Sequence, residues 1–175
     1  MTNIITGAAM PLPSCITINT HGSCQTQQAA GAFGAIMARY IDGKLHSELE
    51  RKGGATGTTS NRMELSAVIF AMKRIKRDEP LPIFILSASK YLIENWKTQV
   101  PGWIANGWLK TNGTPVLNVD LWREIVRLCD GLEVAFEWRQ AEAGGPNAVK
   151  ARNVAAKERK KWEDKAVSEM FGEAA

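Results

Sequence analysis

A histidine, a glutamate and an arginine whose types could do chemistry together lie far apart along the chain. His21 ends a short alternation of isoleucine with polar residues, Glu64 begins an amphipathic stretch, and Arg152 lies in a charged C-terminal segment. A histidine and a carboxylate can together ligate a transition metal. A guanidinium can instead hold a phosphate without supplying a nucleophile. If the fold brings these side chains together, their types would permit phosphate binding or, as the alternative, metal-dependent hydrolysis.

Each of these residues also has a structural interpretation that stays open at this point. Glu64 follows Asn61 at the spacing of a helix-capping pair, and its carboxylate could also form an ion pair with Arg152. His21 could fill a polar position at a strand end. Arg152 could belong to the solvated face of a helix.

The composition is that of an ordinary globular protein with a mild basic excess. The net charge is +4 over 175 residues and the sequence pI is about 9.1, which permits nucleic-acid binding without requiring it. Cys15, Cys24 and Cys129 form no zinc or disulfide pattern, which favours a cytoplasmic protein. No segment approaches the ~20 apolar residues of a membrane span, so no membrane association is expected. We expect one domain over residues 15–170, preceded by a flexible arm at residues 1–14.

Hydrophobic periodicity predicts the elements that must position these side chains. Strand patterns occur at residues 16–18, 31–41, 44–51, 83–86 and 132–138. Helix patterns occur at residues 65–77, in two stretches within 89–111, at 118–129 and at 147–170. Asp42-Gly43 predicts a hairpin turn, whereas the glycines and threonines of residues 52–59 predict a loop. The continuous apolar run 83–86 predicts a strand buried on both faces, inside a mixed sheet.

Five local motifs then resemble one family, in the order that the family has them. Residues 58–65 nearly repeat its Thr-Thr-Asn-Asn-Arg-Met-Glu-Leu, and residues 18–24 resemble its strand ending in Thr-Asp-Gly-Ser. The other motifs are residues 86–91, 107–122 and 142–146. The chain thus resembles type 1 ribonuclease H over about residues 15–160. The resemblance implies an α/β fold with a five-stranded mixed sheet, three antiparallel strands and then parallel additions, flanked by helices.

The resemblance also implies where the family's catalytic centre falls. Active members hold two Mg²⁺ ions with four carboxylates. Those positions correspond here to a four-residue centre of His21, Glu64, Ala88 and Arg152, and a gapped alignment places Lys157 at the last position. Glu142 replaces the histidine of the family's loop. With one carboxylate left, we expect two-metal binding and cleavage to be lost, and we expect no cofactor.

Substrate contacts are implied less evenly. Thr59 and Asn61 match family residues that contact the nucleic acid, and His21 and Arg152 could replace the metal charge. The family's handle corresponds to residues 103–109 and lacks its basic cluster, which leaves Trp103, Trp108 and the nearby Lys110 as further candidates.

Three functions are therefore weighed. The leading one is a pseudoenzyme that binds an RNA·DNA hybrid or another structured nucleic acid. The second is a protein-interaction module that uses the apolar handle. The third is a residual or altered metal-dependent ribonuclease that uses Glu64 with His21.

Overall fold

The molecule is built on one five-stranded mixed sheet. The computed structural model describes residues 13–25, 30–140 and 144–172, so the proposed arm lies almost entirely outside the described residues. The strands are β1 Cys15–Cys24, β2 Gly31–Ile41, β3 Lys44–Ala55, β4 Ile83–Ser87 and β5 Val134–Trp138. Their order is β3-β2-β1-β4-β5. β2 is antiparallel to both β1 and β3, and β4 is parallel to both β1 and β5.

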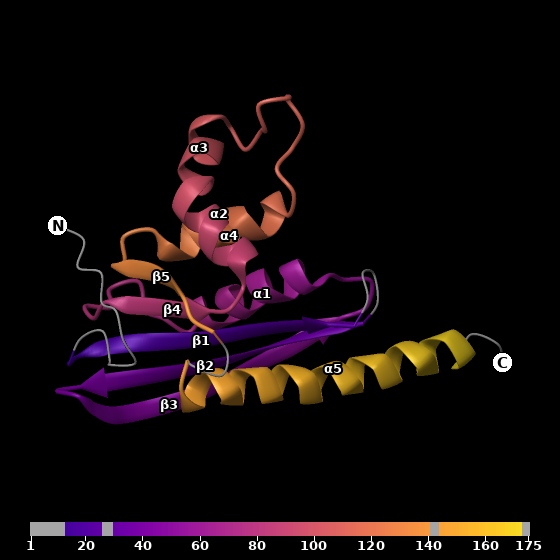
Figure 1. Ribbon diagram of the computed structural model, residues 1–175, viewed down its shortest axis with the longest axis horizontal. Helices are drawn as coiled ribbons and strands as arrows, with labels where there is room; N and C mark the ends of the chain where they lie inside the picture. The colour runs from indigo at the N-terminus through magenta and orange to yellow at the C-terminus, as the bar shows by residue number, and fades with distance from the viewer. Residues whose placement is uncertain (1–12, 26–29, 141–143, 173–175) are drawn as a thin grey trace.

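Helices cover both faces of the sheet (Figure 1). They are α1 Ser60–Met72, α2 Lys90–Thr98, α3 Val100–Ala105, α4 Val119–Cys129 and α5 Pro146–Gly172. α5 runs along β1, β2 and β3 on one face, while α1 packs on the same strands from the other face and contacts α4. The predicted order of elements and the mixed sheet are confirmed.

The third strand is longer than its sequence predicts. The prediction ended it at residue 51 and made 52–59 a loop, whereas β3 continues to Ala55. Its two glycines do not break the strand, because they make room for aromatic rings. A Cβ on Gly53 would lie 2.9 Å from the ring of Phe33, and one on Gly54 would lie 2.4 Å from that of Trp162. Glycine here marks close approach of a neighbour.

Both ends of α1 also differ from the prediction. The N-cap is Thr59, whose Oγ1 accepts a hydrogen bond from the Arg62 backbone N–H at 3.3 Å, so the predicted capping by Asn61 and Glu64 is wrong. The helix ends at Met72, whereas the prediction carried it to residue 77. Backbone N–H groups of Arg74 and Ile75 bond to carbonyls three residues back, which tightens the chain into a 3₁₀-type turn.

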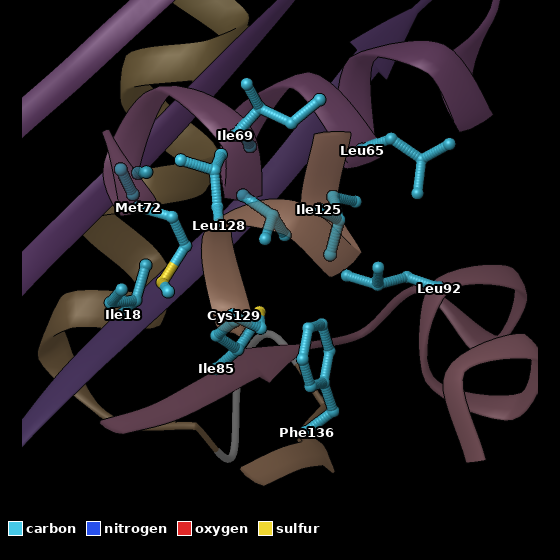
Figure 2. Packing of buried hydrophobic residues seen from close by; sticks show 14 of the residues in the cluster. Ile18, Leu65, Ile69, Met72, Ile85, Leu92, Ile125, Leu128, Cys129 and Phe136 are labelled. Carbon is cyan, nitrogen blue, oxygen red and sulfur yellow. The ribbon is translucent and has the colours of Figure 1, made fainter. Parts of the chain in front are cut away.

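The core lies between the sheet and the helices α1, α2 and α4. Figure 2 shows side chains from β1, β4 and β5 meeting side chains of those helices. Ile18 of β1, Ile85 of β4 and Leu65 of α1 are fully buried there. β4 lies between β1 and β5 inside the mixed sheet, as its continuous apolar run predicted. Burial on both faces is only partly met, because Ile83, Ile85 and Ser87 are buried whereas Phe84 and Leu86 are half-buried. Within the described residues, no helix is long and apolar enough to span a bilayer.

Candidate functional site

The candidate site lies at the carboxyl ends of the three parallel strands. Thr20 of β1 pairs with Ser87 of β4, and Ser87 pairs with Trp138 of β5, so these residues form one row across the sheet. His21 and Ala88 come next along their strands. In open α/β sheets, ligands bind outside this edge.

Glu64 lies against β1 because Gly22 has no side chain. A Cβ on Gly22 would meet the Glu64 backbone nitrogen at 2.5 Å and its Cγ at 2.9 Å. The Gly22 backbone N–H donates a hydrogen bond to the Glu64 carboxyl, and the Ser87 Oγ donates another at 3.3 Å. The one carboxyl group of the four-residue centre is therefore engaged inside the protein.

Burial changes the protonation of this carboxyl group. The Glu64 side chain is buried, and burial raises its pKa to about 7, although the hydrogen bonds from Gly22 and Ser87 act in the opposite direction. Near neutral pH the group is thus only partly ionised.

His21 points to the opposite face of the sheet, toward α5. It pairs with Gly34 of β2, and a Cβ on Gly34 would lie 2.4 Å from the Ala151 carbonyl oxygen of α5. Directly paired residues present their side chains on the same face. Burial and then the positive charge of Arg152 lower the pKa of His21, so the imidazole is neutral at neutral pH. A neutral His21 thus lies close enough to the cationic Arg152 for the charge of Arg152 to act on it.

The two residues that the alignments offered for the fourth position of the centre, Arg152 and Lys157, both lie on α5. Arg152 is half-buried and its charge acts on His21. Lys157 is exposed and lines a shallow cavity with Glu50 and Lys52 of β3. The geometry therefore favours Arg152 as the residue that joins the centre.

The donor set does not fit a pair of Mg²⁺ ions. Mg²⁺ requires hard, mostly anionic oxygen ligands, but Ala88 supplies no ligand, His21 no negative charge and Arg152 a positive one. Among the residues that the structure describes, no group of three or more His, Cys, Asp or Glu side chains could hold a metal ion. Glu142, which replaces the loop histidine of the family, lies outside the described residues.

The predicted nucleic-acid contacts around α1 lie next to the same edge. Thr59 caps the helix and Asn61 is half-buried in its first turn. Arg62, which the prediction did not single out, forms a bidentate ion pair with Asp120 of α4, with a shortest distance of 2.7 Å. Arg62 also donates to the Asn118 Oδ1 at 3.2 Å. Its place inside the 58–65 motif was the available signal.

The tryptophans of the handle pack inward. Trp103 lies 5.8 Å from Trp122 in an edge-on contact, and the Trp108 ring lies 5.8 Å from the Arg123 guanidinium. Exposed apolar area in the handle comes instead from Ile104 and Leu109, which are 47% and 41% exposed. The exposed Lys110 follows and lines a shallow cavity with Trp103.

Two further residues of the edge were missed by the sequence analysis. Ser87 joins Glu64 to β4, and Trp138 donates its Nε1–H to the Ala88 carbonyl oxygen at 3.2 Å. Their signal was position alone, since Trp138 ends the predicted strand 132–138 and Ser87 directly follows the predicted strand 83–86.

Comparison with known proteins supplies the family. The family model RNase H matches residues 13–160. The ribonuclease H of Saccharopolyspora erythraea is 35% identical over 147 residues, which cover 83% of this chain and 91% of that protein.

Solved structures share the fold. LC9-RNase H1, a type 1 RNase H with the type 2 active-site motif, superimposes with a TM-score of 0.72 at 22% sequence identity. The superposition covers 88% of this chain and 76% of the LC9-RNase H1 chain. The foamy viral protease-reverse transcriptase, solved in complex with RNA/DNA hybrid, gives 0.63 at 18% identity over 91% of this chain and 22% of that one. The family-model match and the identity to a curated relative show that the chain belongs to the ribonuclease H family.

Proposed function

We propose that this chain binds an RNA·DNA hybrid, or another structured nucleic acid, without two-metal cleavage. One observation carries the proposal: a cationic Arg152 beside a neutral His21, in a centre where two Mg²⁺ ions would need several anionic oxygens. A fixed guanidinium can occupy the role of a metal ion in holding a phosphate oxygen. It cannot activate a water molecule for attack.

Family membership supports the choice of ligand. Curated relatives carry the name ribonuclease H, and the foamy viral protein of the same fold was solved with an RNA/DNA hybrid bound. Thr59 caps α1 and Asn61 lies in its first turn, on the helix that also carries Glu64, and the net charge of +4 suits a polyanion. We place the phosphate at His21 and Arg152, and the flanking backbone contacts at α1.

A binding titration across salt concentration tests this function. Fluorescence anisotropy would follow a labelled hybrid with the wild type, Arg152→Glu and Lys76→Glu. Both substitutions change the net charge equally, but Lys76 is exposed beyond the far end of α1. Loss of a charged phosphate contact predicts at least about a tenfold weaker affinity for Arg152→Glu, and a salt slope reduced by about one. Equal affinities for the two variants would refute the proposed phosphate site.

A cleavage assay addresses the missing chemistry and the altered-enzyme alternative together. We expect a labelled hybrid to remain intact after long incubation with Mg²⁺, Mn²⁺ or Zn²⁺. Cleavage that disappears in Glu64→Gln would instead establish a metal-dependent enzyme that uses Glu64 and His21. A preparation of Glu64→Gln made in parallel controls for contaminating nucleases.

The exposed Ile104 and Leu109 favour a second candidate, a protein-docking role for the handle. Both side chains lie outside the packing of Trp103 and Trp108. Double substitution Ile104→Ser and Leu109→Ser should then abolish binding of a protein partner and leave hybrid affinity unchanged. Weaker hybrid binding by this variant would assign the handle to the nucleic acid.

A further inference from the structure

Trp138 is the exposed tryptophan of this protein. All six tryptophans of the sequence lie within the described residues, and five are buried or half-buried. Trp138, the last residue of β5, leaves 48% of its surface exposed. A large aromatic side chain that stays exposed does not gain the stabilisation that burial provides. Trp96 does gain it, because its ring stacks on that of Phe136 with 4.1 Å between the ring centroids.

The exposed ring is nevertheless held in place. Its Nε1–H donates to the Ala88 carbonyl oxygen at 3.2 Å, and the Arg139 backbone N–H donates to the Ser87 carbonyl oxygen at 2.9 Å. Trp138 also belongs to the row that joins Thr20 and Ser87. The indole therefore lies in a defined position at the edge that carries His21 and Ala88. A pre-positioned ring loses little conformational entropy when a ligand stacks on it.

We infer that Trp138 is a stacking platform for one unpaired nucleobase beside the four-residue centre. The inference rests on the proposed binding of nucleic acid and names the form of the ligand. Bases inside a duplex are stacked on each other and cannot lie on the ring, so the base must come from an overhang, a frayed end or a single strand. One half-exposed ring matches the face of one base, whereas a protein interface buries about 800 Å² per partner.

Hybrids that differ only in an overhang test the inference. Affinities would be measured for a blunt hybrid and for the same hybrid with a short single-stranded extension at either end. Stacking of one base is worth about 1–3 kcal/mol, so we expect the wild type to bind one extended hybrid about 5- to 150-fold more tightly. Trp138→Leu should lose this preference and keep its affinity for the blunt hybrid.

Two further variants separate stacking from a structural role. Trp138→Phe keeps an aromatic face without the Nε1–H donor, so most of the overhang preference should remain. Phe70→Leu removes an aromatic ring that is 41% exposed near the C-terminal end of α1. This control should change neither the affinity for the blunt hybrid nor that for the extended hybrid. Melting temperatures of all variants would show that the fold is intact.

The outcomes distinguish this inference from the function on which it rests. Equal loss in the Phe and Leu variants would assign Trp138 to the hydrogen bond with Ala88 and overturn the stacking role. Tight hybrid binding by the wild type with no overhang preference would overturn the inference and leave the proposed function standing. Hybrid binding no tighter than that of a generic basic protein would overturn both.

Discussion

At the scale of single residues, the side chains of Glu64 and His21 lie on opposite faces of the sheet at β1. Glu64 is buried on the α1 side and hydrogen-bonded by Gly22 and Ser87. His21 faces α5, where burial and then the charge of Arg152 favour its neutral form. Near neutral pH the Glu64 carboxyl is only partly ionised, so it repels an incoming anion less than a full carboxylate would. The neutral imidazole adds no positive charge, so within the proposed centre the positive charge is that of Arg152.

The raised pKa of Glu64 predicts a pH-dependent stability. Between about pH 4.5 and 7 the folded protein holds a proton that the unfolded chain has released, so the free energy of unfolding falls as pH rises through this window. The full shift corresponds to about 3 kcal/mol. Glu64→Gln removes this contribution, so denaturant unfolding of the variant and the wild type should differ by a pH-dependent amount over that window.

His21 acts with the opposite sign, which makes the variant comparison necessary. Its lowered pKa means that stability is lost as pH falls below about 6.5, where the unfolded imidazole takes up a proton. The difference between wild type and Glu64→Gln cancels this contribution. A constant difference from pH 4 to 8 would contradict the protonation assigned to Glu64.

The residues of this centre could be named from the sequence, but their contacts could not. Five ordered motifs located positions 21, 64, 88 and 152. The partners of Glu64 depend on the closeness of α1 to β1 at Gly22 and on the register of β4, which set where Ser87 lies. Capping by Glu64 was a reasonable local alternative that this tertiary packing overrode.

At the scale of elements, two glycines set how closely the helices approach the sheet. Gly22 admits α1 at Glu64, and Gly34 admits α5 at Ala151. The residue-scale arrangement depends on both, because His21 reaches Arg152 only if α5 lies directly on β2. Periodicity predicted each helix and strand, whereas these contact distances arise from pairs of elements that are distant in sequence.

Gly34→Ala should therefore weaken the docking of α5. The added Cβ would lie 2.4 Å from the Ala151 carbonyl oxygen, and a backbone atom cannot move aside as a flexible side chain does. Overpacking of this kind costs about 1–3 kcal/mol, which urea unfolding would measure. Gly102→Ala is the matched control, because nothing lies within 4 Å of its Cβ position in α3. Similar unfolding midpoints for the two variants would show that α5 packs less tightly than described.

At the scale of the whole molecule, the sheet brings together residues that are far apart in the sequence. β1, β4 and β5 end at one edge, and α1 and α5 reach that edge from opposite faces. The family's fold is kept, and three of the four positions of the proposed centre hold His21, Ala88 and Arg152 in place of carboxylates. Because the scaffold positions are retained, replacing three side chains should be enough to restore the affinity for metal ions.

The triple variant His21→Asp, Ala88→Asp, Arg152→Asp tests this retention. With Glu64 it would place four carboxyl groups at one edge, where mutual repulsion lowers stability until a divalent cation binds. Millimolar Mg²⁺ should raise its melting temperature, since a ligand of the folded state stabilises by RT ln(1 + [L]/Kd). The wild type should show no such shift beyond that of ionic strength, matched with NaCl. Adding Glu64→Gln to the triple variant should reduce the shift, because one anionic ligand is lost. An equal rise in melting temperature with Mg²⁺ in the wild type and the triple variant would mean that the natural centre already binds the cation. That result would contradict the proposal that the centre binds nucleic acid without two-metal cleavage.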